Sequence, residues 1–167
     1  PFDLVLIDHH TDMQSSIVGD MLSCGNWAKK ALQNPFLHRL YLIGPSKHDL
    51  KSVEQNKVLS FSIEELEQGA TIPLETKYHV YISIDKDVLD EKYAMTIWNQ
   101  GDMSLGMLED VLAHFLKNCE VIGIDICGDD PDIDDYPTYI KAERINNLSD
   151  DALYQTAMKI LKRRQKK

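Results

Sequence analysis

Short apolar runs alternate along the chain with segments whose apolar residues recur at helical spacing. The runs are rich in Val, Ile, Leu and Tyr, and several are apolar on both faces, as in a sheet covered on two sides. Because helix-period segments separate them, the pattern predicts an α/β fold with a doubly wound, mostly parallel sheet and helices on both faces. We expect strands at residues 3–8, 37–44, 57–62, 78–85 and 120–126.

Serine residues mark the expected starts of the helices. Ser62 is followed three residues later by Glu65, which is a capping-box signature, and Gly69 suits the end of that helix. Ser104 and Ser149 each precede a further run with helical spacing. The pattern predicts helices at residues 23–34, 62–69, 104–118 and 149–164.

The length of 167 residues predicts one domain over residues 1–167. An apolar strand begins almost at once after Pro1, with no initiator Met and no preceding element. We therefore expect the chain to be the C-terminal portion of a longer protein, truncated at its N-terminus.

The net charge of −9 argues against nucleic acid and against an anionic membrane as partners, because both require a basic surface. No apolar run approaches the roughly 18 residues that a membrane-spanning helix needs. Cys24, Cys119 and Cys127 are too few and too scattered for a disulfide framework or a cysteine zinc site. We expect reduced thiols in a cytoplasmic protein whose partner is a small molecule or a metal ion.

Two expected strands end in clusters of metal-binding residues. The first is followed by Asp8, His10 and Asp12 in a D-x-H-x-D pattern, and the other ends with Asp85 and Asp87. Carboxylates with one imidazole suit a hard or borderline divalent ion such as Mn²⁺. Neighbouring carboxylates repel each other unless a cation lies between them, so two such strand ends could build a dinuclear hydrolytic centre.

The segments "IDHHTD", "SIDKDVLD", "TIWNQGDMSLGMLEDVL" and "GIDICGDDP" together resemble the arginase/agmatinase/formiminoglutamase family of ureohydrolases. The resemblance covers roughly residues 3–131. It implies a doubly wound α/β fold, a centre of two manganese ions, and hydroxide formed at those ions that attacks a trigonal carbon. It also implies a small cationic, nitrogen-rich substrate and a homo-oligomer.

Carried over by position, the family pattern makes Asp8 and Asp85 the catalytic carboxylates that bridge both ions. His10 and Asp87 would bind one ion and Asp12 the other. The family's further ligand is a histidine well upstream, where this chain has nothing but Pro1, so one metal position is expected to be incomplete.

Two further features depart from the family pattern. Ala28 stands where arginases carry a proton-shuttling histidine, although the nearby Asn26 matches and is a candidate for substrate binding. Gly128 stands where arginases and agmatinases carry a guanidinium-binding glutamate, and Asp129 or Asp130 could replace it. The substrate pocket is therefore expected to differ from that of arginase.

The leading interpretation is a dinuclear manganese hydrolase of linear C–N bonds in guanidino, amidino or formimino compounds, with the isolated chain inactive. A second interpretation is a catalytically impaired relative that binds a metal or a ligand without turnover. A third takes "VLIDHH" as the signature of the DHH phosphoesterases, but a downstream G-G-G-H segment and basic residues for phosphate are missing from the sequence.

Overall fold

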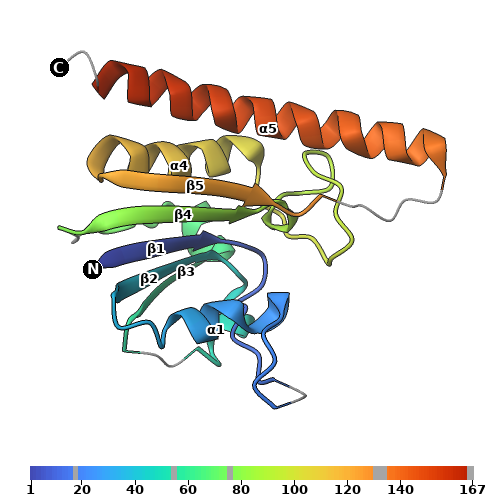
Figure 1. The fold of residues 1–167 in the computed structure, drawn as a ribbon. Coiled ribbons are helices and arrows are strands. Elements are labelled where there is room, and N and C mark those ends of the chain that lie inside the picture. Colours follow the sequence, from blue (N-terminus) through green and yellow to red (C-terminus); the bar gives the residue numbers. More distant parts are fainter. Residues whose placement is uncertain (17–18, 54–55, 75–76, 130–134, 165–167) are drawn as a thin grey trace.

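Five parallel strands form one sheet in the computed structural model, which describes residues 1–16, 19–53, 56–74, 77–129 and 135–164 (Figure 1). The order across the sheet is β3-β2-β1-β4-β5. The strands are β1 (Phe2–Ile7), β2 (Leu37–Gly44), β3 (Val58–Ser62), β4 (His79–Asp85) and β5 (Val121–Cys127). The order reverses between β1 and β4, and the crevice beyond such a pair is where open α/β sheets bind ligands.

The register of β1 and β4 brings the two acidic strand ends together. Ile7 on β1 lies opposite Ile84 on β4, so Asp8 and Asp85 follow at the same level of the sheet. The backbone N–H of Asp8 donates to the carbonyl of Ile43 on β2 at 3.0 Å, which keeps Asp8 attached to the sheet edge. Both carboxylates therefore leave the sheet at its carboxyl edge.

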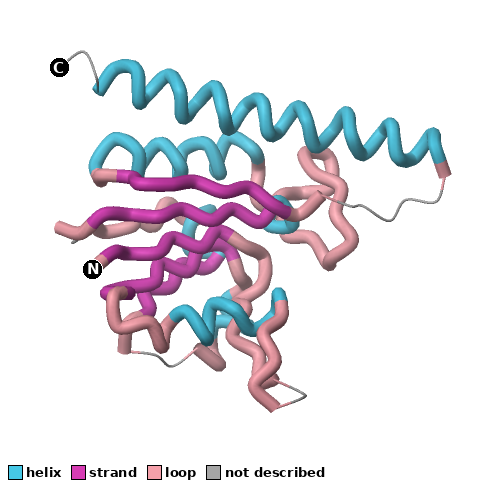
Figure 2. Tube along the Cα trace, viewed as in Figure 1, coloured by secondary structure: helices cyan, strands magenta, loops and turns pink. Residues whose placement is uncertain are grey.

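Helices cover both faces of the sheet, which confirms the predicted fold class (Figure 2). Alternate residues of β1 point to opposite faces, so Leu6 belongs to one core and Ile7 to the other. The face with Leu6 is covered by α1 (Trp27–Ala31), which follows the short turn η1 (Cys24–Asn26), and by α2 (Lys47–Leu50). The opposite face is covered by α3 (Ile63–Glu67), α4 (Leu105–Asn118) and α5 (Tyr136–Arg164).

The expected caps of α3 and α4 are present. The Ser62 hydroxyl accepts from the N–H of Glu65 at 3.2 Å, and the Glu65 carboxylate accepts from the N–H of Ser62 at 2.9 Å. The Ser104 hydroxyl likewise accepts from the N–H of Met107 at 3.2 Å. The helix expected over 23–34 is shorter than predicted and consists of η1 followed by α1.

The predicted start of the last helix at Ser149 is wrong, because α5 already begins at Tyr136. The Asp135 carboxylate accepts from the N–H of Thr138 at 2.9 Å, and Pro137 suits the first turn of a helix. Ser149 is buried within the helix and donates to the carbonyl of Tyr93. In the described part of the chain, no helix has the length and apolarity needed to cross a membrane.

Candidate metal centre

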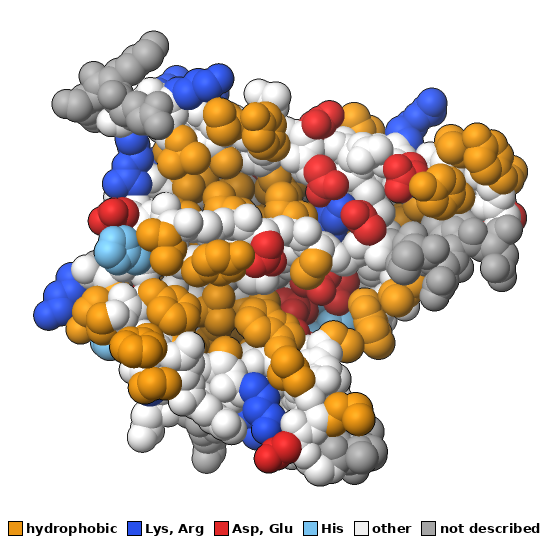
Figure 3. All heavy atoms as spheres, in the orientation of Figure 1, with side chains coloured by type: hydrophobic (Ala, Val, Ile, Leu, Met, Phe, Trp, Pro, Cys, Tyr) orange, Lys and Arg blue, Asp and Glu red, His pale blue; other side chains and the backbone are white. Residues whose placement is uncertain are grey.

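One cavity of about 270 Å³ lies at the carboxyl edge of β1 and β4. All five side chains that the sequence singles out as metal ligands line it: Asp8, His10, Asp12, Asp85 and Asp87. Figure 3 shows acidic side chains gathered beside a histidine in a hollow flanked by hydrophobic residues. The sheet register therefore converts two separated sequence motifs into one constellation.

The β1 end turns sharply after the strand. The Asp8 carboxylate is buried, and its Oδ1 accepts from the backbone N–H of His10 at 2.6 Å. Asp12 has φ = +51°, a left-handed conformation that Asp adopts more readily than most residues but that still costs about 1–3 kcal/mol. This bend keeps the Asp12 side chain at the cavity instead of continuing the strand away from it.

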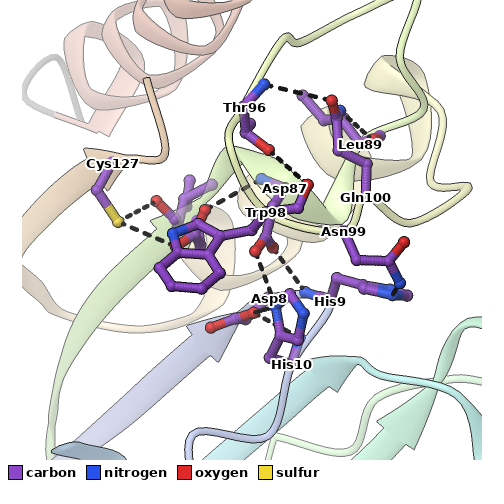
Figure 4. Close-up of polar contacts among 12 residues, drawn as sticks. Asp8, His9, His10, Asp87, Leu89, Thr96, Trp98, Asn99, Gln100 and Cys127 are labelled. Carbon is purple, nitrogen blue, oxygen red and sulfur yellow. Dashed lines mark hydrogen bonds and ion pairs between the residues drawn. The ribbon is translucent and has the colours of Figure 1, made fainter. Parts of the chain in front are cut away.

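The β4 end supplies Asp85 and Asp87 through the one-turn helix η2 (Lys86–Val88). Asp85 Oδ1 accepts from the N–H of Asp87 at 3.0 Å. Asp87 in turn meets the β1 end, because its Oδ1 accepts from the N–H of His9 at 3.1 Å and its Oδ2 lies 2.8 Å from His10 Nδ1 (Figure 4).

Asp8, His10 and Asp87 form the tightest group in this cavity. Each offers one ligand atom, and these atoms lie within 4.8 Å of one another. Asp12 and Asp85 line the same cavity outside that group.

Crowding of buried carboxylates changes the proton affinity of the site. Burial raises the pKa of Asp8 to about 8, and the neighbouring charges of Asp87 and Asp12 add to the rise. Burial also raises the pKa of Asp12 to about 6, and burial together with Asp87 raises the pKa of Asp85. Hydrogen bonds to Asp8 and Asp87 raise the pKa of His10 to about 10.

A divalent cation would relieve this repulsion, because it replaces the protons that otherwise neutralise the cluster. Four carboxylates and one imidazole are also the donor types that hard or borderline ions such as Mn²⁺ accept. The residues present therefore fit a divalent metal centre.

Two neighbours of the predicted ligands play other parts. The ring of His9 lies against the loop at Asn99, whose side-chain amide is 3.3 Å from His9 Nε2. Trp98 lines the cavity, with half of its surface exposed.

The residues considered for substrate binding lie outside the metal cavity or outside the described chain. The amide of Asn26 is engaged locally, accepting from the N–H of Ser23 at 2.9 Å and donating to the carbonyl of Met21 at 2.9 Å. Asp129 lies 2.5 Å from the ammonium of Lys86, and Asp130 lies outside the described residues.

The two other departures from the family pattern have structural reasons. Gly128 has φ = +100°, and a Cβ at that position would collide with Oδ1 of Asp85 and lie 2.8 Å from the backbone N of Lys86. A glutamate at position 128 is incompatible with this approach. Ala28 lies on α1 and is fully buried in the core, so its side chain does not reach the cavity.

Sequence reasoning missed several residues of this region. Gln14 and Cys24 line the cavity, but neither residue type carries a specific signal for such a position. Lys86 is 1% exposed, although lysine is among the residues least often buried. Its position between two acidic residues at the end of an apolar strand was the available signal.

Comparisons with known proteins show what the chain is similar to. The model of the arginase family matches residues 1–147. An uncharacterised protein from Thermotoga maritima is 33% identical over 146 residues, which are 87% of this chain and 55% of that protein.

Solved structures share the fold. The agmatine ureohydrolase of Thermoplasma volcanium has a TM-score of 0.73 at 20% identity, with 99% of this chain and 56% of that chain covered. The formimidoylglutamase from Bacillus subtilis has a TM-score of 0.67 at 19% identity, with 96% of this chain and 53% of that chain covered. An arginase-like protein of T. brucei, solved as a triple mutant bound with Mn²⁺, has a TM-score of 0.62 at 22% identity, with 93% of this chain and 52% of that chain covered. The chain spans about half the length of these relatives.

Proposed function

The chain belongs to the arginase family, and on this premise we propose that it carries the metal centre of a hydrolase of linear C–N bonds in guanidino, amidino or formimino compounds. The observation that carries the proposal is the convergence of five family-type ligands on one cavity. Because the chain spans about half the length of its relatives, the activity is proposed for the whole protein. We expect the isolated 167-residue chain to be inactive.

Two manganese ions are the proposed cofactor. Asp8 and Asp85 would hold both ions, His10 and Asp87 one ion, and Asp12 the other. When bound, such ions lower the pKa of water and supply a nucleophile near neutral pH. The Mn²⁺ bound to the T. brucei arginase-like mutant supports the choice of metal.

The surrounding side chains prepare this centre. The His10 ring is oriented with Nδ1 toward the cavity carboxylates, 2.8 Å from Asp87 Oδ2 and 3.6 Å from Asp8 Oδ1. Trp98 presents its ring at the cavity, where it can flank a bound substrate.

The proposed substrate is a small, cationic, nitrogen-rich molecule. The described lining contains no Lys or Arg, and its carboxylates give it a negative potential that favours cations. Asn26, Asp129 and Asp130 remain proposed substrate contacts. Of these, Asp129 would first have to release the Lys86 ammonium.

Binding without turnover is the second candidate function. The close approach at Gly128 excludes a glutamate side chain, and Ala28 lies within the core, so two groups that arginases use have no counterpart at these positions. Such a protein would hold a metal or a ligand but release no product. The phosphoesterase interpretation gains no support, because a different family model matches and no Lys or Arg lines the described cavity.

Cytoplasmic location and homo-oligomer formation also remain proposals. The first rests on the scattered cysteines, and none of the three is in a disulfide in the described structure. The second rests on the family alone. Size-exclusion chromatography with light scattering would test it.

Metal content and product release test the proposed function. The 167-residue chain, and the longest natural form of the protein, are loaded with Mn²⁺ and analysed for bound metal after desalting. Each is then incubated with a panel of guanidino, amidino and formimino compounds while urea, ammonia and formamide are measured. Asp87→Asn serves as the control with a damaged centre.

The proposal predicts close to two Mn²⁺ per natural-length protein, turnover of at least one compound, and loss of both in Asp87→Asn. Metal binding without product from any compound would support the binding protein instead. No metal binding by either form would overturn both interpretations.

A further inference from the structure

A lysine is buried between the two acidic residues at the end of β4. Lys86 occupies the first position of η2, between Asp85 and Asp87, and is 1% exposed. Its ammonium lies 2.5 Å from Asp129 and 3.0 Å from Asp150. Burying a charged lysine is costly without a partner, and here two carboxylates compensate for it.

The ion cluster joins three elements that are distant in sequence. Lys86 follows β4, Asp129 follows β5, and Asp150 lies on α5. The Lys86 side chain is absent from the lining of the metal cavity, whereas the residues on either side of it belong to that lining. The Lys86 side chain therefore points away from the centre, while its two sequence neighbours, Asp85 and Asp87, point into it.

The backbone of the same turn is held from the other side. Gly128 lies so close to this turn that a Cβ on it would be 2.8 Å from the backbone nitrogen of Lys86 and 3.3 Å from the Lys86 Cβ. Together, the ion cluster and the close approach leave the η2 turn little room to move.

The position of η2 determines where Asp87 lies. The N–H of Asp87 is bound to Asp85, and its carboxylate is bound to the N–H of His9 and the ring of His10. A displacement of η2 would break these contacts and separate the ligand sets of β1 and β4.

We propose that Lys86 is a positioning residue of the metal centre, which fixes Asp85 and Asp87 by tying the η2 turn to Asp129 and to Asp150 on α5. The inference rests on the proposed function to the extent that these two aspartates hold metal. Buried ion pairs often contribute little net stability but can select one arrangement of the chain, and this is the role that the geometry gives to Lys86.

An effect of Lys86 through its charge and an effect through positioning predict opposite changes in Mn²⁺ affinity when the lysine is removed. If Lys86 acted only through its charge, Lys86→Met would tighten binding of Mn²⁺, because a cation near a dication site repels the metal. If Lys86 positions the ligands, the same change weakens binding. The sign of the effect therefore separates the two roles.

The experiment compares Lys86→Met with Lys92→Met, which removes an exposed lysine that lies 3.9 Å from Asp90, a few residues beyond the turn. Hydrogen exchange is measured in the metal-free chain over residues 8–10 and 85–89, with β2 as the internal reference. Mn²⁺ affinity is measured by titration calorimetry. Asp150→Asn, in which Lys86 keeps its contact with Asp129, is included in case Lys86→Met does not fold.

We expect Lys86→Met to raise exchange over residues 8–10 and 85–89 and to weaken Mn²⁺ binding about tenfold or more, as loss of groups that orient metal ligands does. Asp150→Asn is expected to raise exchange in the same segments to a smaller extent, and Lys92→Met to change neither property. Unchanged exchange over 85–89, an equal rise across β2, or tighter Mn²⁺ binding would overturn the inference. Absence of Mn²⁺ binding by the unmodified protein would overturn the proposed function, while the exchange measurement would still decide the role of Lys86.

Discussion

His10 Nδ1 lies 2.8 Å from Asp87 Oδ2, although 77 residues separate the two in the sequence. The contact joins the turn after β1 to the turn after β4, and these strands are neighbours at the point where the strand order reverses. It orients the imidazole toward the same cavity as the four carboxylates. The adjacent His9 ring is directed to the loop at Asn99 instead.

Substitution of the two neighbouring histidines should therefore have different consequences. We expect His10→Ala to weaken Mn²⁺ binding about 100-fold, because it removes a proposed ligand and not merely a group that supports one. His9→Ala is the matched control and should change affinity by less than about fivefold, because the backbone N–H that bonds Asp87 remains. Titration calorimetry measures both. An equal loss in the two variants would show that His10 has no special part in the centre.

Metal-free stability should fall as the pH rises from about 4 to about 8. The pKa of Asp8 is raised by burial to about 8, so the folded protein favours the protonated form and is penalised as that proton leaves. The pKa of His10 is raised to about 10, so its stabilising contribution is complete below its ordinary value of 6.5 and is lost as the pH approaches 10. Both effects have the same sign. Thermal unfolding in EDTA across this range measures the trend, and Asp8→Asn should flatten it.

Added Mn²⁺ should stabilise the protein more at pH 8 than at pH 6, because metal ligands must lose their protons before they bind. A free Mn²⁺ concentration of about 100 times the dissociation constant would add about 2.7 kcal/mol to the free energy of unfolding. The measurement is the shift of the unfolding midpoint between EDTA and MnCl₂ at each pH. A shift that is equal at the two values, or smaller at pH 8, would argue against binding through these groups.

Gly128→Ala should destabilise the protein by about 1–3 kcal/mol, because its φ of +100° is strained for any side chain and a Cβ would collide with Asp85. Gly106→Ala is the matched control, since Gly106 lies in α4 with no atom within 4 Å of an added Cβ and should gain up to about 1 kcal/mol. Urea unfolding measures both changes. A Gly128→Ala variant as stable as the original protein would show that the loop after β5 adapts easily, and would weaken the explanation for the missing glutamate.

The sequence predicted the sheet well because its strands carry strong, uninterrupted apolar patterns. β2 begins and ends where expected, and the caps of α3 and α4 are visible as Ser62 and Ser104. The start of α5 was missed because its first half has a weak apolar stripe and follows an acidic segment. Ser149 looked like a cap, but it is a small residue that lets α5 approach the carbonyl of Tyr93.

The convergence of the five predicted ligands on one cavity was predictable, because motifs at the ends of neighbouring parallel strands must meet at one edge of the sheet. The sequence did not predict which residues each side chain contacts. The pairing of Lys86 with Asp150 depends on how α5 packs over the sheet, and the engagement of Asn26 depends on the path of a loop. Neither has a periodic or spacing signal.

The first half of α5 also anchors the loop that leads to Trp98. The Asn146 side chain accepts from the N–H of Met95 at 2.8 Å and donates to the carbonyl of Met95 at 2.9 Å, and it is 5% exposed. We expect Asn146→Ala to destabilise the protein by about 1–3 kcal/mol, because it leaves two backbone groups of Met95 without partners. Exchange over residues 93–98 should rise as well, since α5 no longer anchors that loop.

The neighbouring Asn147 is exposed and provides the control with the same chemical change. Asn147→Ala should alter unfolding by no more than about 0.5 kcal/mol. Urea unfolding gives the free energies, and hydrogen exchange followed by mass spectrometry locates the change. If Asn146→Ala lowers stability without faster exchange over 93–98, the residue supports α5 alone, and the link from this helix to the wall of the cavity at Trp98 is broken.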